Sequence, residues 1–149
     1  FVEDTLAILK EYDFPPSQLW IEITERCRDL PISMIKKTVT AFREAGIHIT
    51  MDDYGTGSSS SQMMLELPVE GIKIDMFFVK DILEEKKKQA LVIGMINFAN
   101  AADLKICIEG IENDSLESYL RQFDVTCFQG YHYSRPICQD ELMKLLIKP

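Results

Sequence analysis

Residues 47–60 read IHITMDDYGTGSSS, and this stretch decides both the fold class and the kind of site to look for. Alternating apolar residues over 47–52 predict a β-strand with one buried face. Asp52 and Asp53 then stand side by side at the mouth of a loop rich in glycine and serine. Adjacent carboxylates repel each other and gain nothing from a core, so the pair indicates a positively charged partner.

Four further segments have the character of strands, at 19–23, 71–75, 104–110 and 125–130. Between them, apolar residues recur at the helical spacing of i, i+4 and i+7. The expected helix faces are Leu6 and Leu9; Ile35, Val39 and Phe42; Leu91, Met95, Phe98 and Ala102; Leu116, Leu120 and Phe123; and Leu142, Leu145 and Leu146. Strand and helix alternate without a linker or repeat, which predicts one α/β domain with a parallel sheet.

The two-residue period of a strand separates two faces. Four strands have one aliphatic face suited to packing under helices; the fifth fits less well. The opposite face carries a polar residue near the C-terminal end of every strand: Glu22, Asp52, Lys73, Glu109 and Gln129. Burying such a charge without a partner costs several kcal/mol, and polar groups at the C-terminal ends of parallel strands mark the ligand side of an α/β barrel or open sheet.

Glu22, Asp52, Asp53 and Glu109 offer the hard oxygen ligands that Mg²⁺ or Mn²⁺ prefers. Two such ions could neutralise the adjacent aspartates, activate water and hold the leaving oxygen in phosphate-ester hydrolysis. Lys73 could neutralise a phosphoryl group or hold the attacking water. Taken alone, D-D-x-G-T-G also fits an ordinary strand-to-loop turn capped by Asp, without any ligand.

Composition narrows the class of partner. The 149 residues are 46% hydrophobic and carry a formal net charge of −8, which argues against binding to DNA or to an anionic membrane surface. No apolar run approaches the ~20 residues of a membrane span. The four cysteines are widely spaced, which favours reduced thiols in a cytoplasmic protein. Cys107 and Cys127 are expected to face inward and to be packed rather than redox-active.

Five motifs in order resemble one family: IEITE (21–25), DDYGTGSSS (52–60), IKID (72–75), IEGIE (108–112) and QGYHYSRP (129–136). Together they resemble the EAL domain of bacterial phosphodiesterases, which hydrolyse cyclic di-GMP to linear pGpG. The resemblance implies a TIM-like (β/α) barrel that uses Mg²⁺ or Mn²⁺. It would be incomplete in this chain, which has about five parallel strands with alternating helices.

The resemblance also implies roles for individual positions. Glu22, Asp52, Asp53 and Glu109 match metal-binding positions, and Lys73 and Glu109 match catalytic ones. Glu25 matches a residue that steadies the loop after the double aspartate. Glu112 matches a glutamate near the substrate, and Gln129 an active-site glutamine.

Several family features are missing from these residues. Neither the Glu-Ala-Leu strand nor the later strand with a metal-binding asparagine is found, so residues 1–149 are interpreted as a partial EAL domain without its N-terminal strands. Ser58 stands where the family usually has an aromatic residue, and Met76 where it often has Arg. Because two ligands are missing, little turnover is expected from this chain alone.

Two other functions stay open: a degenerate EAL domain that senses the nucleotide or binds a protein without catalysis, and an unrelated metal-using barrel. The expected context is a cytoplasmic protein with an upstream sensory or GGDEF domain. Because five strands leave two free sheet edges, a homo-oligomer is also expected. His48 is interpreted as a hydrogen-bonded core residue and His132 as an exposed loop residue.

Overall fold

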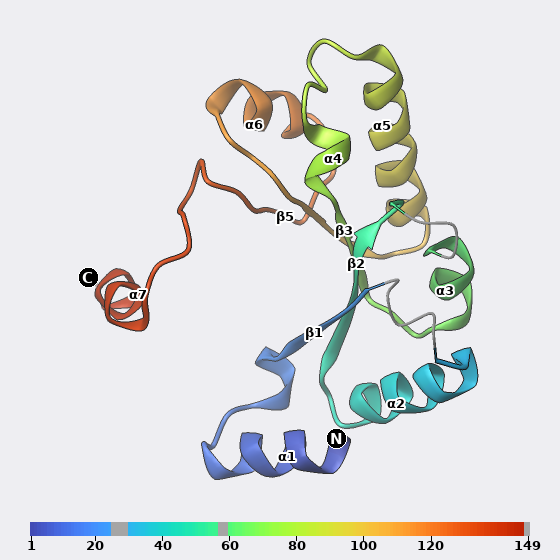
Figure 1. Ribbon diagram of the computed structural model, residues 1–149, viewed down its shortest axis with the longest axis vertical. Helices are drawn as coiled ribbons and strands as arrows, with labels where there is room; N and C mark the ends of the chain where they lie inside the picture. Colours follow the sequence, from blue (N-terminus) through green and yellow to red (C-terminus); the bar gives the residue numbers. More distant parts are fainter. Residues whose placement is uncertain (25–29, 57–59, 148–149) are drawn as a thin grey trace.

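Five short strands form one parallel sheet: β1 (Trp20–Ile23), β2 (His48–Tyr54), β3 (Gly71–Ile74), β4 (Lys105–Ile108) and β5 (Cys127–Phe128), which lie across the sheet in that order (Figure 1). The computed structural model describes residues 1–24, 30–56 and 60–147. The predicted parallel α/β sheet of about five strands is confirmed. Each crossover advances by one strand, and over the described residues β1 and β5 pair on one side only, so the sheet is open.

Seven helices accompany the strands in the described ranges. They are α1 (Val2–Glu11), α2 (Ile32–Glu44), α3 (Ser60–Glu66), α4 (Met76–Val79), α5 (Lys86–Ala101), α6 (Asp114–Leu120) and α7 (Gln139–Leu146), with a 3₁₀ turn, η1, at Pro16–Gln18. Helices α2, α3 and α5 line one side of the sheet, and α7 stands apart on the other side (Figure 1). None of the helices in this part of the chain combines the length and the apolar character needed to cross a membrane.

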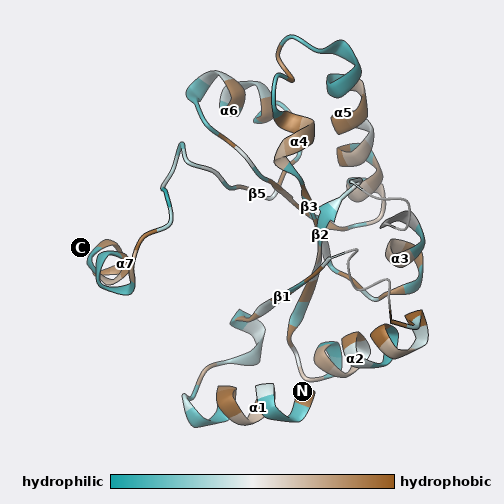
Figure 2. Ribbon diagram, viewed as in Figure 1, coloured by the Kyte–Doolittle hydropathy of each residue, from teal (hydrophilic) through white to brown (hydrophobic). Residues whose placement is uncertain are grey.

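The core lies between the sheet and these helices. Strand alternation places one aliphatic row across four strands, where Ile23, Met51, Ile72 and Ile106 are register partners, and all four are buried. Hydrophobic residues accordingly concentrate in the strands and recur along the helices (Figure 2), and the buried ones form a single core cluster. The predicted aliphatic face is confirmed. Because side chains alternate along each strand, the intervening polar residues lie on the opposite face of the sheet.

The predicted contact face of α5 is wrong. Val92, Ile96 and Ala99 are buried against the sheet, whereas Leu91 and Phe98 are 47% and 39% exposed. Both stripes have the i, i+4, i+7 spacing, so periodicity alone cannot choose between them. The smaller Val92 and Ala99 side chains allow the helix to approach the sheet more closely than Leu91 and Phe98 would.

The regular pairing of β2 and β3 is interrupted at the two aspartates. Met51 pairs with Ile72 and Tyr54 with Ile74, so Asp52 and Asp53 together oppose the single residue Lys73. This is a β-bulge, in which one strand carries an extra residue. Asp53 takes the left-handed conformation, with φ of 53°, and Tyr54 returns to the buried face.

Candidate active site

The polar side chains at the C-terminal ends of the strands meet around Lys73. Its Nζ lies 2.7 Å from Glu109 Oε1, 2.9 Å from Glu22 Oε1 and 3.2 Å from Asp52 Oδ1. These contacts join β1, β2, β3 and the residue that follows β4. The side chain of Lys73 is only 10% exposed, so the ammonium group is held inside a ring of carboxylates.

This ring controls the charge state of Lys73. Burial opposes protonation, yet hydrogen bonds to Glu109 and Glu22 outweigh it and raise the pKa of Lys73 above its ordinary value. Lys73 therefore stays protonated at neutral pH. One positive charge faces three carboxylates here, before Asp53 is counted, so the site keeps an excess of negative charge.

The bulge adds the second aspartate to the group. Carboxylate oxygens of Asp52, Asp53 and Glu109 all lie within 4.8 Å of one another. In a regular strand, Asp53 would point to the buried face because Asp52 points to the polar one. The bulge keeps Asp53 on the polar side, and Tyr54 is the next residue to point to the buried face. Three carboxylates thus share one small volume beside the ammonium group.

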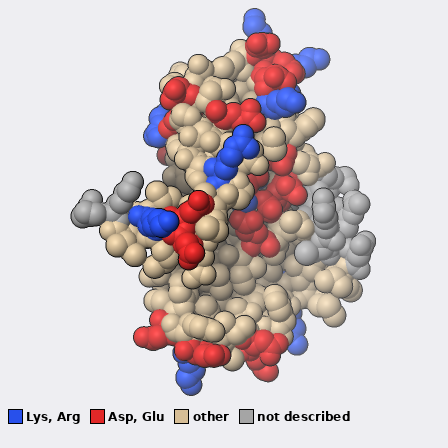
Figure 3. All heavy atoms as spheres, turned by 60° about the vertical axis from the view of Figure 1, so that its left-hand side comes forward, with Lys and Arg blue, Asp and Glu red and all other residues tan. Residues whose placement is uncertain are grey.

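The donor set fits a hard divalent cation. Asp52 Oδ1 is buried and accepts no well-aligned hydrogen bond from the described residues, although Lys73 Nζ is 3.2 Å away. The ammonium group of Lys73 offsets part of the cost of burying this oxygen, and a divalent cation held by Asp52, Asp53 and Glu109 would satisfy it further. Acidic groups also gather near the hollowed middle of this face of the molecule (Figure 3).

Glycines bring the remaining loops to the site. Gly110 turns the chain after Glu109 with a φ of +74°, and a side chain on Gly130 would clash with the backbone of Ile111. Ile111 N donates to Gln129 O at 3.0 Å, and His132 N donates to Ile111 O at 2.9 Å. The segments after β4 and β5 are therefore joined through their backbones.

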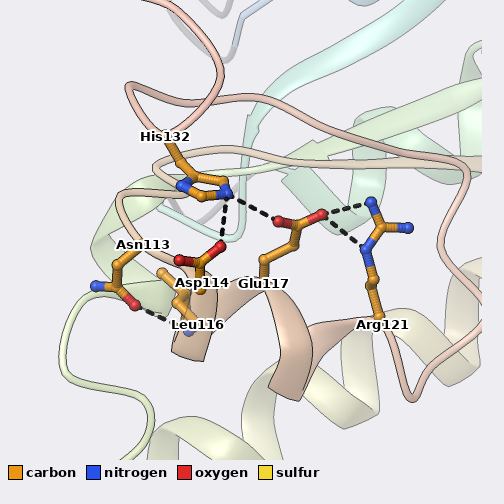
Figure 4. Close-up of polar contacts among 6 residues, drawn as sticks. All are labelled: Asn113, Asp114, Leu116, Glu117, Arg121 and His132. Atoms are coloured by element: carbon orange, nitrogen blue, oxygen red, sulfur yellow. Dashed lines mark hydrogen bonds and ion pairs between the residues drawn. The ribbon is translucent and has the colours of Figure 1, made fainter.

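A second polar cluster anchors the loop after β5 to α6. His132 Nε2 lies 2.9 Å from Glu117 Oε2 and 3.5 Å from Asp114 Oδ1, and Arg121 pairs with the other oxygen of Glu117 (Figure 4). Arg121 also lies over the ring of Phe128, with 5.5 Å to the centroid. The interpretation of His132 as an exposed residue is wrong, because its side chain is only 23% exposed and held by α6.

The structure brings most, but not all, of the predicted site residues together. Glu22, Asp52, Lys73 and Glu109 are in contact and Asp53 joins them, while Gln129 lines the same cavity of about 330 Å³ as Glu22 and Lys73. Glu112 is exposed and lines a separate cavity of about 270 Å³ between α4 and α6, which Met76 also lines. Glu25 and Ser58 lie outside the described residues.

Sequence reasoning missed the anchor formed by Glu117, Arg121 and His132. The i, i+4 spacing of Glu117 and Arg121 predicts an ion pair on a helix. The contact with His132 is not predictable in this way, because His132 lies 15 residues farther along the sequence than Glu117. His48, by contrast, is hydrogen-bonded as predicted: its Nδ1 lies 2.6 Å from Glu70 Oε2, and its ring stacks on Trp20. It is not a core residue, however, because its side chain is 27% exposed.

Known proteins are similar to this chain in sequence and in fold. The family model described as EAL domain matches residues 1–136. The cyclic di-GMP phosphodiesterase RocR of Pseudomonas aeruginosa is 30% identical over 142 residues, covering 95% of this chain and 36% of RocR. The chain spans about a fifth of the length of several other curated relatives.

Two solved structures match the fold closely. The EAL domain of Mycobacterium smegmatis DcpA has a TM-score of 0.92 at 31% identity, over 97% of this chain and 65% of that one. A manganese/cy-diGMP complex of Klebsiella pneumoniae BlrP1 has a TM-score of 0.83 at 28% identity, over 91% of this chain and 34% of BlrP1. The fold is therefore TIM-barrel-like, with a sheet that does not close over the described residues.

Proposed function

Because the chain belongs to the EAL domain family, we propose that it forms the C-terminal part of a metal-dependent phosphodiesterase domain that hydrolyses cyclic di-GMP to linear pGpG. The observation that carries the proposal is the convergence of Glu22, Asp52 and Glu109 on the buried ammonium group of Lys73. The name of RocR and the cy-diGMP bound to BlrP1 support the choice of substrate.

The position of each residue supports a proposed role. Asp52, Asp53 and Glu109, with Glu22 nearby, would hold Mg²⁺ or Mn²⁺, which when bound would polarise the phosphate and favour ionisation of a water molecule. The ammonium group of Lys73 can donate a hydrogen bond that fixes the oxygen of this water. Glu109 would accept the proton that the water loses as its oxygen bonds to phosphorus. The ester P–O bond breaks, and the departing sugar oxygen takes up a proton from solvent.

Residues at the rim would bind the rest of the substrate. Gln129 reaches the cavity of Lys73 from the end of β5, and its amide can hydrogen-bond to phosphate or base. Glu112 lies farther out and suits a contact to a base. We also propose that Glu25 supports the loop after Asp53.

The remaining context is proposed on the same basis. Residues 1–149 would be a partial domain completed by N-terminal strands, in a cytoplasmic homo-oligomer with an upstream sensory or GGDEF domain. The small share of its relatives' length that this chain covers supports further domains.

The test compares the 149-residue chain with a longer chain that includes the preceding strands, each with cyclic di-GMP and Mg²⁺ or Mn²⁺. Hydrolysis to pGpG is expected from the longer chain and little from the shorter. Lys73→Met in the longer chain should lower kcat at least 100-fold, as expected for the loss of a group at the reacting atoms. The matched control, Lys87→Met on the exposed side of α5, should leave it unchanged.

Cyclic di-GMP that binds the longer chain without being hydrolysed would instead establish the alternative of a nucleotide-sensing module. Neither binding nor hydrolysis by the longer chain would refute both functions.

A further inference from the structure

Two cysteines face each other in the row of the sheet that holds Lys73. Cys107 on β4 is the register partner of Lys73 on one side and of Cys127 on the other. Both cysteines line the 330 Å³ cavity on the polar face. Cys107 is half-buried, whereas Cys127 is exposed, so the prediction that both are packed is wrong for Cys127. In this chain a small solute can reach the pair from the side of β5, which the proposed N-terminal strands would cover in the complete domain.

The side chains of Cys107 and Cys127 lie next to each other on the polar face of the sheet. Cys127 Sγ lies 3.9 Å from Ile106 O, which shows that its side chain leans toward β4. Because both side chains project from the same face of neighbouring strands, the sulfur atoms stay close together in the folded chain.

The backbone geometry is compatible with a covalent bond. Neighbouring strands lie about 4.8 Å apart, within the Cα separation of about 4.4–6.8 Å that disulfides span. β5 has only two residues and pairs on one side over the described ranges, so it can make the small approach to β4 that an S–S bond requires.

We propose that Cys107 and Cys127 are a modification site, at which a hydroperoxide converts the two thiols into a reversible intramolecular disulfide. The exposed Cys127 attacks the peroxide; its S–O bond forms, the O–O bond breaks, and water or an alcohol leaves. Cys107 then attacks the sulfenic sulfur, the S–S bond forms, the S–O bond breaks, and the hydroxyl group leaves as water with the proton of the Cys107 thiol. The two sulfur atoms are oxidised and the peroxide is reduced.

The test uses the full 149-residue chain with the exposed Cys138 replaced, as Cys138→Ser. This change is needed because trypsin cleaves poorly between Arg135 and Pro136, so Cys127 and Cys138 otherwise share one peptide. After treatment with hydrogen peroxide, free thiols are blocked with iodoacetamide and the digest is analysed by mass spectrometry.

The expected result is a cross-link between peptides 106–121 and 122–144, with the loss of two of the three remaining thiols and their recovery with dithiothreitol. In buffer, the cross-link should join Cys107 to Cys127 and leave Cys27 free. In urea, where the chain is unfolded, Cys27 should form disulfides as readily as the other two cysteines. In the additional variant Cys107→Ser, dimedone should label Cys127 instead.

The proposal is overturned if all three thiols survive peroxide in the folded chain, or if Cys27 replaces Cys107 or Cys127 in the cross-link. It is also overturned if Cys127 is oxidised to sulfinic acid without forming a cross-link. None of these readouts depends on hydrolysis of a nucleotide.

Discussion

At the scale of single residues, Lys73 is the shared positive counter-charge of three carboxylates in the site. Lys73→Met should lower the free energy of unfolding at pH 7 by about 2 kcal/mol, because three carboxylates lose their shared counter-charge. The expected loss is below the ~3–5 kcal/mol of a fully buried pair because Glu22 is half-exposed. Urea denaturation measures it.

Exposed Lys87 provides the control for that measurement: Lys87→Met should change stability by less than about 0.5 kcal/mol. Adding Mg²⁺ should restore part of the stability that Lys73→Met loses, since a cation can replace the missing charge. Equal stability of the two variants would show that Lys73 is not the counter-charge of the site.

The thiol of Cys107 makes stability depend on pH in the alkaline range. Its pKa in the folded chain is raised from about 9 to about 12, so its contribution is complete below pH 9 and is lost as the pH rises toward 12. Stability curves from pH 8 to 11 should therefore fall less steeply for Cys107→Ala than for the original chain. Cys138→Ala, at an exposed position, is the control and should leave the slope unchanged.

Much of this site can be predicted at the residue scale, because strand alternation needs only neighbouring residues. It places Glu22, Lys73 and Glu109 on one face, and the structure brings them together. The same rule fails at Asp53, because a bulge depends on the pairing of β2 with β3, which lies in no single segment.

At the scale of elements, the loop that follows β5 depends on the close approach of Gly130 to Ile111. Gly130→Ala should destabilise the chain by about 1–3 kcal/mol, since its Cβ would push the backbone of Ile111 away and break the hydrogen bonds that join the two loops. Thermal unfolding and proteolysis of the loop after β5 would measure the effect.

Gly94 in α5 is the matched control, because a Cβ there meets nothing within 4 Å. Gly94→Ala should stabilise the helix by about 0.5–1 kcal/mol. If the two substitutions change stability in the same direction, the contact at Gly130 does not have the importance assigned to it.

Long elements are predictable and short ones are not. The five strands and helices α1, α2, α5, α6 and α7 are expected from periodicity, whereas α3 and α4 are not. α4 has only four residues and depends on Asp75, whose carboxylate accepts a hydrogen bond from Phe77 N at 2.7 Å. Such a short helix covers little more than one turn, so hydrophobic periodicity cannot mark it.

At the scale of the whole molecule, α7 is the element least tied to the rest. None of its residues is buried, and Leu142, Leu145 and Leu146 are 46–69% exposed. A chain that ends at Pro136 should unfold with a free energy within about 0.5 kcal/mol of the original, because little packing is lost. It should also associate less, since an apolar helix face has been removed.

Size-exclusion chromatography with light scattering tests this expectation, and Leu145→Glu is the variant that keeps the helix but charges its face. Association that persists in both variants would assign it to the open edges of β1 and β5 instead. The parallel architecture was predictable because alternation runs along the whole chain, but the separation of α7 from the body was not, because its amphipathic pattern is that of a packed helix.

The bulge at Asp52 and Asp53 has one more consequence, for how such a sequence can evolve. Deleting one aspartate would restore uninterrupted pairing between Met51 and Tyr54 and leave the hydrophobic side of β2 in phase. The second acid is thus a one-residue insertion that the core does not require. A related protein that has lost this aspartate would keep the same fold. The loss would indicate that catalysis was no longer under selection in that protein.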